Sequence, residues 1–254
     1  GFLSKEHPEL AASVQSAVNS DAVFAPILGI YVMGSFGSIS QTSASDLDIW
    51  ICHQDDLSEQ DQQRLAEKTK KITQWASTFH VEMHFYLMTQ KRFRNERYSD
   101  PLTKENSGSA QYMLLLEEFY RSAVRLAGKP LLWLHLWVED EKQYEAEVAR
   151  LVAEGELNPN DWVDFGGLGQ FSASEYFGAS LWQLYKGIDS PYKSVMKILL
   201  LETYAQEYPN AHLIARQFKE DLLSGRSTAA HHFDPYIAIL ERISQYLTAH
   251  SEFK

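Results

Sequence analysis

Residues 34–50, GSFGSISQTSASDLDIW, join a Gly-Ser pair to two aspartates through a small polar loop. Apolar runs lie on both sides of that loop, ILGIYVMG at 27–34 and DLDIWICH at 46–53, and each indicates a buried strand. Side chains at positions i and i+2 of a strand share one face, so Asp46 and Asp48 point the same way. The sequence therefore predicts two neighbouring strands, with a pair of carboxylates at the start of the second.

This carboxylate pair predicts a cation site. Two like charges held together repel, and one aspartate tends to take up a proton unless a divalent cation keeps both ionised. Mg²⁺ is the natural candidate, because it prefers hard oxygen ligands and completes its shell with water and substrate phosphates. At the end of the preceding strand, Gly34 and Ser35 can place backbone N–H groups and a hydroxyl against phosphate oxygens. The alternative for Asp46 and Asp48 is an exposed polar strand face.

A long helix and a third strand follow. The segment LSEQDQQRLAEKTKKITQWASTF (57–79) has an apolar stripe at helical spacing and predicts a surface helix. The segment VEMHFYLM (81–88) alternates apolar and polar residues, which is the period of a half-buried strand. Glu82 and His84 share its polar face. The position of Glu82 fits a solvated strand residue as well as a functional one. A single strand histidine such as His84 is more often structural than a ligand.

The second half of the sequence is mostly helical in pattern. AQYMLLLEEFYRSAVRLAG (110–128) predicts a helix that ends at Gly128, KPLLWLHLWV (129–138) predicts a strand, and 95–109 predicts a loop. We expect further helices at 7–18, 139–154, 173–187, 191–207, 210–223 and 235–250. The expected fold class is α+β: a mixed sheet with flanking helices, followed by a mostly helical subdomain. We place the division between residues 1–140 and 141–254.

The composition of the chain indicates which partners it can bind and in which compartment it is found. The chain has 34 acidic and 23 basic residues and a net charge of -11, which disfavours long nucleic acids but permits a local site for one nucleotide. The single cysteine, Cys52, lies in an apolar run and indicates a buried thiol in a reducing compartment. No run approaches about eighteen apolar residues, and no signal-peptide layout opens the chain. We therefore expect a cytoplasmic protein without membrane insertion.

The spacing of the Gly-Ser pair and the Asp-x-Asp motif resembles the signature of the DNA polymerase beta-like nucleotidyltransferase superfamily. Longer stretches resemble the N-terminal catalytic portion of the class I adenylate cyclases of enterobacteria and their relatives. These stretches are YVMGSFGSISQTSASDLDIWICHQ, SAQYMLLLEEFYRSAVRLAGK and EYFGASLWQLYKGIDSPYKSVMKILLLETYAQEYPN. The resemblance extends over about residues 27 to 250.

The resemblance implies a nucleotidyltransferase-like sheet, an activity and a set of site residues. The activity is conversion of ATP to 3′,5′-cyclic AMP and pyrophosphate by attack of the ribose 3′-hydroxyl on the α-phosphate. Two Mg²⁺ ions, or Mn²⁺, would assist it, held by Asp46, Asp48 and, as the third acidic residue, Glu82. The residues expected to bind phosphate are Gly34, Ser35, Ser190, Lys193, Lys186 and Lys197. By their spacing alone, Lys193 and Lys197 lie four residues apart on one helical face and could bind a triphosphate or be ordinary solvated side chains.

The resemblance also implies a regulatory partner and leaves rival functions open. The partner is the glucose-specific carrier of the phosphotransferase system, and we expect it to need a C-terminal region beyond Lys254. One rival is a transferase of the same superfamily that adenylylates a separate acceptor. The others are a catalytically silent nucleotide-binding module and a purely structural module.

Overall fold

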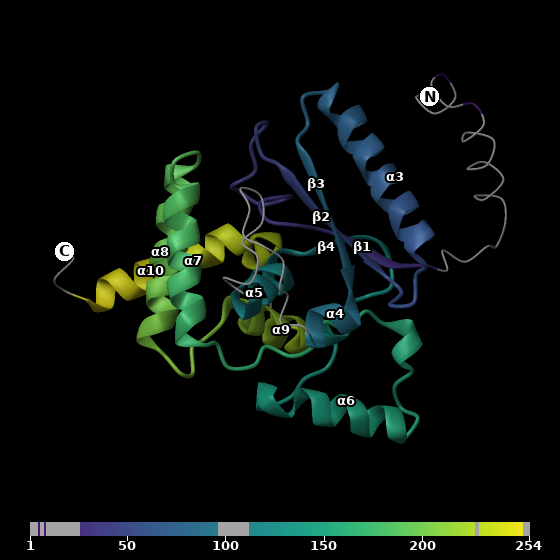
Figure 1. Ribbon diagram of the computed structural model, residues 1–254. Helices are drawn as coiled ribbons and strands as arrows, with labels where there is room; N and C mark the ends of the chain where they lie inside the picture. The colour runs from purple at the N-terminus through teal and green to yellow at the C-terminus, as the bar shows by residue number, and fades with distance from the viewer. Residues whose placement is uncertain (1–4, 6–7, 9–25, 96–111, 227–228, 251–254) are drawn as a thin grey trace.

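The computed structural model describes residues 26–95, 112–226 and 229–250, together with residues 5 and 8. Four strands form one mixed sheet in the order β3-β2-β1-β4. They are β1 (Ile27–Met33), β2 (Leu47–His53), β3 (Met83–Thr89) and β4 (Val124–Gly128). β1 is antiparallel to β2 and β4, whereas β2 and β3 are parallel and are connected through α3 (Glu59–Ser77). Figure 1 shows α3 lying along the sheet, on the side away from the other helices.

The sequence explains why α3 forms and which side of it is buried. The Ser58 hydroxyl accepts a hydrogen bond from the Asp61 N–H at 3.1 Å, which caps the first turn of the helix. Leu65 is 8% exposed and packs with the buried strand residues Val32, Ile49 and Ile51. The predicted helix and the three predicted strands around it are confirmed.

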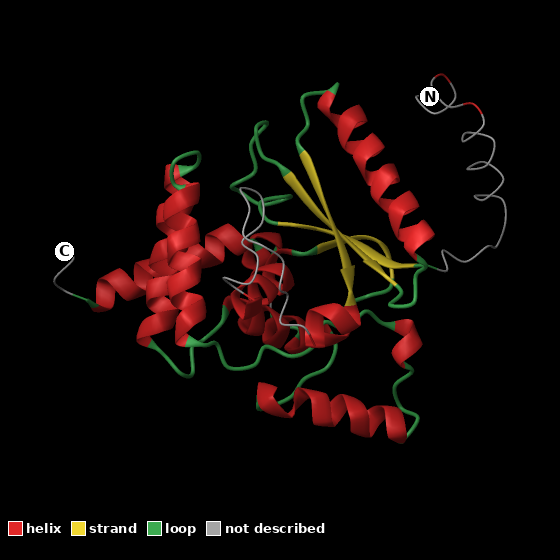
Figure 2. Ribbon diagram, in the orientation of Figure 1, coloured by secondary structure: helices red, strands yellow, loops and turns green. Residues whose placement is uncertain are grey.

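The remaining helices gather on the other side of the sheet, as Figure 2 shows in red. They are α4 (Gln90–Asn95), α5 (Tyr112–Ser122), α6 (Tyr144–Ala153), α7 (Ala173–Lys186), α8 (Pro191–Gln206), α9 (Ile214–Ser224) and α10 (Pro235–Ala249), with short 3₁₀ turns η2 (Leu132–Leu134), η3 (Glu141–Gln143), η4 (Pro159–Asp161) and η5 (Ala230–Phe233). The five helices predicted after residue 138 are confirmed, with ends that differ by a few residues. The α+β class, a mixed sheet followed by a helical part, is confirmed as well.

The prediction for residues 110–138 is wrong in two places. The predicted helix ends at Ser122, and the next residues form β4, which adds to the free edge of β1. Gly128 is not a helix cap: it has φ +82° and approaches β1 so closely that a Cβ would lie 2.4 Å from the Leu28 carbonyl oxygen. Residues 129–138 contain the 3₁₀ turn η2 in place of the predicted strand. A short apolar run fits a buried strand and a buried helical segment equally well, so its pattern alone does not decide between them.

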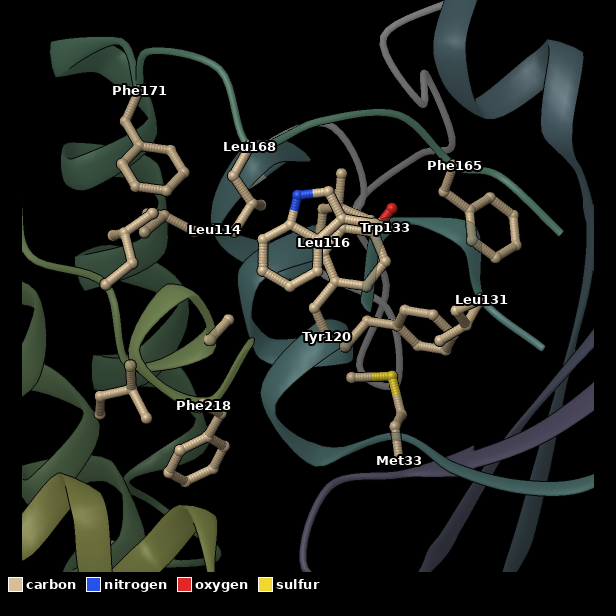
Figure 3. Close-up of a cluster of buried hydrophobic side chains, with 14 of the residues drawn as sticks. Met33, Leu114, Leu116, Tyr120, Leu131, Trp133, Phe165, Leu168, Phe171 and Phe218 are labelled. Atoms are coloured by element: carbon tan, nitrogen blue, oxygen red, sulfur yellow. The ribbon is translucent and has the colours of Figure 1, made fainter. Parts of the chain in front are cut away.

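Aromatic side chains form the main core between the sheet and the helices. The rings of Trp50 on β2 and Phe119 on α5 stack with centroids 4.2 Å apart, and Tyr120 stacks on Trp133 at 4.3 Å. Figure 3 shows this cluster around α5, with Phe218 of α9 beside it. One buried cluster thus runs from β1 to α10, and α5 is held between the sheet and the helical half.

Two predictions lie outside the described residues. The predicted helix at 7–18 does so except at Pro8, and the predicted loop at 95–109 does so except at Asn95, which ends α4. The division at residue 140 stays a prediction. Cys52 is fully buried, as expected.

Candidate active site

A pocket opens where β1, β2 and β3 meet the helices α5, α7, α8 and α10. Of the nine predicted site residues, eight line it: Gly34, Ser35, Asp46, Asp48, Lys186, Ser190, Lys193 and Lys197. They come from segments more than 130 residues apart in the chain, so the fold brings the strand motif and the α8 region together. The ninth, Glu82, is outside the pocket lining.

The acidic pair stands at the start of β2 on the pocket side. Tyr86 of β3 donates its hydroxyl hydrogen to Asp48 Oδ1 at 3.3 Å. Burial raises the pKa of Asp48 to about 6, and the neighbouring Asp46 carboxylate adds to that shift, while His84 and Lys197 oppose it. Burial and the neighbouring carboxylate both disfavour the ionised form of Asp48. A bound cation would stabilise that form, so this pair fits a cation site.

Glu82 lies one residue before β3 and is directed towards solvent. Its side chain is 70% exposed, and its Oε1 is 3.1 Å from His84 Nε2. β2 and β3 pair in parallel register with Asp48 opposite His84, so His84 occupies the wall beside Asp48. The predicted third acid is therefore a neighbour of the pocket lining and touches it through His84.

The Gly-Ser pair follows β1 directly. Gly34 has φ +88°, a left-handed conformation that favours glycine. Its N–H donates to the Ser122 hydroxyl at 3.1 Å, which differs from the expectation that this amide is directed at a phosphate. The Ser35 side chain is buried, and its hydroxyl lies 3.4 Å from Lys193 Nζ. Ser35 and Lys193 thus form the contact between the strand motif and α8.

The two lysines of α8 have different surroundings. Lys197 Nζ lies 2.6 Å from Glu118 Oε1; burial alone would lower the pKa of Lys197, but this carboxylate outweighs it and raises that pKa. Burial lowers the pKa of Lys193, with Asp46 opposing the shift and Lys197 adding to it. Lys197 is therefore neutralised by a protein carboxylate, whereas Lys193 is the better placed of the two to meet an anion.

Glu118 is a pocket residue that the sequence analysis did not identify. It lies on α5 next to Glu117, in the mostly apolar helix YMLLLEEFYRS. Burial would raise the pKa of Glu118, but Lys197 and Arg121 outweigh that effect and lower it. Two adjacent glutamates in an apolar helix were the available signal, since charges are rarely buried without partners.

Ser190 and Lys186 complete the wall near the turn between α7 and α8. Ser190 occupies the N-cap position of α8, yet its side chain makes no capping hydrogen bond. Lys186 Nζ lies 5.8 Å from the centre of the Trp182 ring, within reach of a cation–π contact. Ser190 is exposed, Lys186 is partly exposed, and both line the pocket.

The polar loop that follows Ser35 is attached to the helical half. Asp234 caps α10 by accepting from the Tyr236 and Ile237 N–H groups. Its other oxygen accepts from the Ile39 N–H at 2.6 Å. Tyr236, one residue into α10, lines the pocket, so this contact fixes the loop and the wall together.

Metal-binding capacity rests on the two aspartates. In the described part of the chain, no group of three or more His, Cys, Asp or Glu side chains could hold a metal ion. Mg²⁺ is commonly bound by one or two carboxylates plus substrate phosphates and water, so Asp46 and Asp48 fit that arrangement.

None of the described helices is long and apolar enough to cross a bilayer.

Comparison with known proteins gives consistent matches. Residues 4–134 match the family model described as "Adenylate cyclase NT domain", and residues 171–254 match "Adenylate cyclase, class-I, second domain". An adenylate cyclase of Haemophilus influenzae is 73% identical over 96% of this chain, and one of Escherichia coli is 50% identical over 90%. The chain spans only 29% and 27% of the lengths of these two relatives.

One solved structure also matches. It is a spectinomycin adenyltransferase from Enterococcus faecialis with ATP and spectinomycin, at 14% identity and a TM-score of 0.40, covering 94% of this chain and 89% of that one. A likeness at this level carries no argument about the site.

Proposed function

Because this chain belongs to the class I adenylate cyclase family, we propose that its pocket binds ATP and converts it to cyclic AMP and pyrophosphate. The observation that carries the proposal is the meeting of Asp46 and Asp48 with Ser35 and Lys193 in one pocket. Carboxylates for a cation and a lysine with a hydroxyl for phosphate are the two groups that a nucleoside triphosphate requires. The test is whether ATP alone, without a second acceptor, yields cyclic AMP.

The residues of the chain act mainly by positioning. The nucleophile is the 3′-hydroxyl of the substrate, and it displaces pyrophosphate from its own α-phosphate. An intramolecular attack gains most from holding the reacting atoms in line and from fixed charges around the phosphates. Lys193 and Ser35 bind the phosphates from one side, and Ser190 and Lys186 extend this surface. Lys197 supports it through its ion pair with Glu118.

Asp46 and Asp48 are the proposed ligands of two Mg²⁺ or Mn²⁺ ions, with Glu82 as the third carboxylate. When bound, such ions lower the pKa of the attacking hydroxyl and offset the charge on the departing phosphates. The raised pKa of Asp48 supports this role, because a cation removes the penalty of its ionised form. Tyr86 fixes the orientation of Asp48 through its hydrogen bond.

Lys193→Ala is expected to weaken ATP binding about tenfold or more while changing AMP binding little. The ammonium group meets phosphates that AMP lacks, and a hydrogen bond to a charged group contributes about 1.5–3 kcal/mol. Calorimetric titration with both nucleotides measures the effect. Lys68→Ala, on the exposed side of α3, is the matched control. Equal losses for ATP and AMP would show a packing defect instead.

Glu82→Gln is expected to keep ATP binding and to lose most of the chemical step, since Asp46 and Asp48 remain to hold the phosphate-bound cation. Binding is followed by calorimetry and cyclisation by a single-turnover assay on the same preparation. Glu67→Gln, an exposed glutamate of α3, is the control. If Glu82→Gln cyclises ATP at the wild-type rate, Glu82 serves only to hold His84.

Location and regulation are further parts of the proposal. A cytoplasmic location agrees with ATP as substrate and with the buried thiol of Cys52. Regulation by the phosphotransferase carrier would act through regions of the longer relatives that this chain does not match.

A further inference from the structure

Gln183 is a largely buried residue in the wall of the pocket. It lies on α7, lines the pocket and is 5% exposed. Its main-chain carbonyl accepts from the Gly187 N–H at 2.9 Å, as in any helix. Across the described ranges, no hydrogen bond reaches its side-chain amide. The amide is not among the fully enclosed, unpartnered side-chain groups of the described residues, so it reaches the pocket surface, where a ligand can pair with it.

Two neighbouring polar groups of the wall have protein partners. Lys193 contacts Ser35, and Lys197 is paired with Glu118. Among the described residues, the Gln183 amide has no such protein partner and is not fully enclosed, so a molecule bound in the pocket can form hydrogen bonds with it directly. Gln183 lies one turn before Lys186 on the same face of α7, beside the groups proposed to bind phosphate.

The chemistry of an amide selects among nucleobases. It presents N–H donors and a carbonyl acceptor side by side. Adenine offers the complement on one edge, a 6-amino donor next to the ring-nitrogen acceptor at position 7, and glutamine reads that edge with two hydrogen bonds. Guanine has two acceptors at the same places, so a single amide cannot satisfy both.

We propose that Gln183 reads the adenine of the bound nucleotide through its 6-amino group and the nitrogen at position 7, and so determines the preference for ATP over GTP. This inference rests on the proposed function for the location of the nucleotide. It assigns the base to the turn of α7 around Gln183 and the phosphates to Lys186, at the end of α7, and to Ser35 and Lys193. Gln183 is a specificity-determining residue and takes no part in the chemical step.

The test measures nucleotide affinity by calorimetry for ATP, GTP and 7-deaza-ATP, which lacks the acceptor at position 7. The wild-type chain is expected to bind ATP about tenfold more tightly than either analogue, because a good pair of base contacts contributes about 1–3 kcal/mol. Gln183→Met preserves side-chain length without the amide. It is expected to lower ATP affinity about tenfold and to leave the two analogues nearly unchanged, so that the preference disappears.

Two further variants keep the test sharp. Gln183→Leu should repeat the result if Gln183→Met lowers the melting temperature, and Gln206→Leu, at an exposed position outside the pocket lining, should change no affinity. An equal loss for all three nucleotides, or an unchanged preference for ATP, overturns the role of Gln183. Because binding is the readout, a wild-type chain that binds ATP with this preference but forms no cyclic AMP contradicts the proposed function alone.

Discussion

Asp48→Asn is expected to abolish cyclic AMP formation, with a loss of about a thousandfold or more, while the fold stays intact. The carboxylate is one of two proposed metal ligands, and metal-assisted charge stabilisation contributes several kcal/mol to such a reaction. Asparagine keeps the acceptor oxygen that Tyr86 contacts and removes only the charge. Asp46→Asn should behave in the same way. Single-turnover conversion of ATP, with products separated by chromatography, measures the loss.

The same change is expected to stabilise the metal-free protein above about pH 6. Burial raises the pKa of Asp48 to about 6 in the folded state, from the ordinary 3.8. The unfolded chain therefore loses this proton first, and wild-type stability falls as the pH rises through that interval. The variant avoids this loss of stability. The difference between the two pKa values sets its upper limit at about 3 kcal/mol, and partial solvent contact lowers it by screening the charges. Thermal unfolding in a chelator at pH 4 and pH 7.5 measures the difference, which should appear only at the higher pH.

Asp56→Asn, at an exposed position after β2, is the control for both readouts and should change neither. Near-wild-type activity of Asp48→Asn or Asp46→Asn would contradict the two-carboxylate metal site. A loss of stability at pH 7.5 would show that the charged form is already compensated by protein groups.

Glu117→Ala is expected to give the largest loss of stability, about 3–5 kcal/mol. Glu117 is 1% exposed and accepts from Arg121, from the Tyr204 hydroxyl at 3.1 Å and from the Ala215 N–H at 3.2 Å. It thus joins α5 to α8 and to the first turn of α9. Burial alone would lower the pKa of Arg121, but Glu117 and Glu118 outweigh it, so the variant leaves a buried cation short of a partner.

Urea unfolding followed by circular dichroism measures this loss. Glu154→Ala removes an exposed glutamate that pairs with Arg150 at the end of α6, and it should change stability by less than about 1 kcal/mol. A similar small effect for Glu117→Ala would mean that water or neighbouring groups replace the buried carboxylate.

Local patterns in the sequence predicted the sheet core and most helices, because each segment carries its own period. β2 and α3 are examples: one is a continuous apolar run around Trp50, and the other has Leu65 and Ala76 on a single buried side. The segment after Ser122 did not follow, because β4 owes its conformation to the free edge of β1, a partner about 95 residues away. Pairing with a distant strand cannot be recognised from the pattern of a short apolar segment alone.

The pocket lining was predictable where one motif carried it. Asp46, Asp48, Gly34 and Ser35 follow from a single stretch, and the resemblance supplied the lysines of α8. Glu118 and Gln183 were not found. Two adjacent glutamates were a signal for paired buried charges but not for a pocket, and an amide in a helix acquires meaning only from what the fold places beside it. For the Gly34 N–H, the sequence suggested a role that the structure does not show. This N–H donates to the Ser122 hydroxyl, whereas it was expected to donate to a phosphate.

The most direct measurement is incubation of the wild-type chain with ATP and Mg²⁺ as the sole reactants, followed by separation of nucleotides and pyrophosphate. The pocket is proposed to hold the triphosphate against Asp46, Asp48 and Lys193, and to fold it for attack by its own ribose. We predict equal amounts of cyclic AMP and pyrophosphate, formed only with the divalent cation and not by Asp48→Asn. Recovery of unchanged ATP, or release of pyrophosphate without cyclic AMP, would contradict the account.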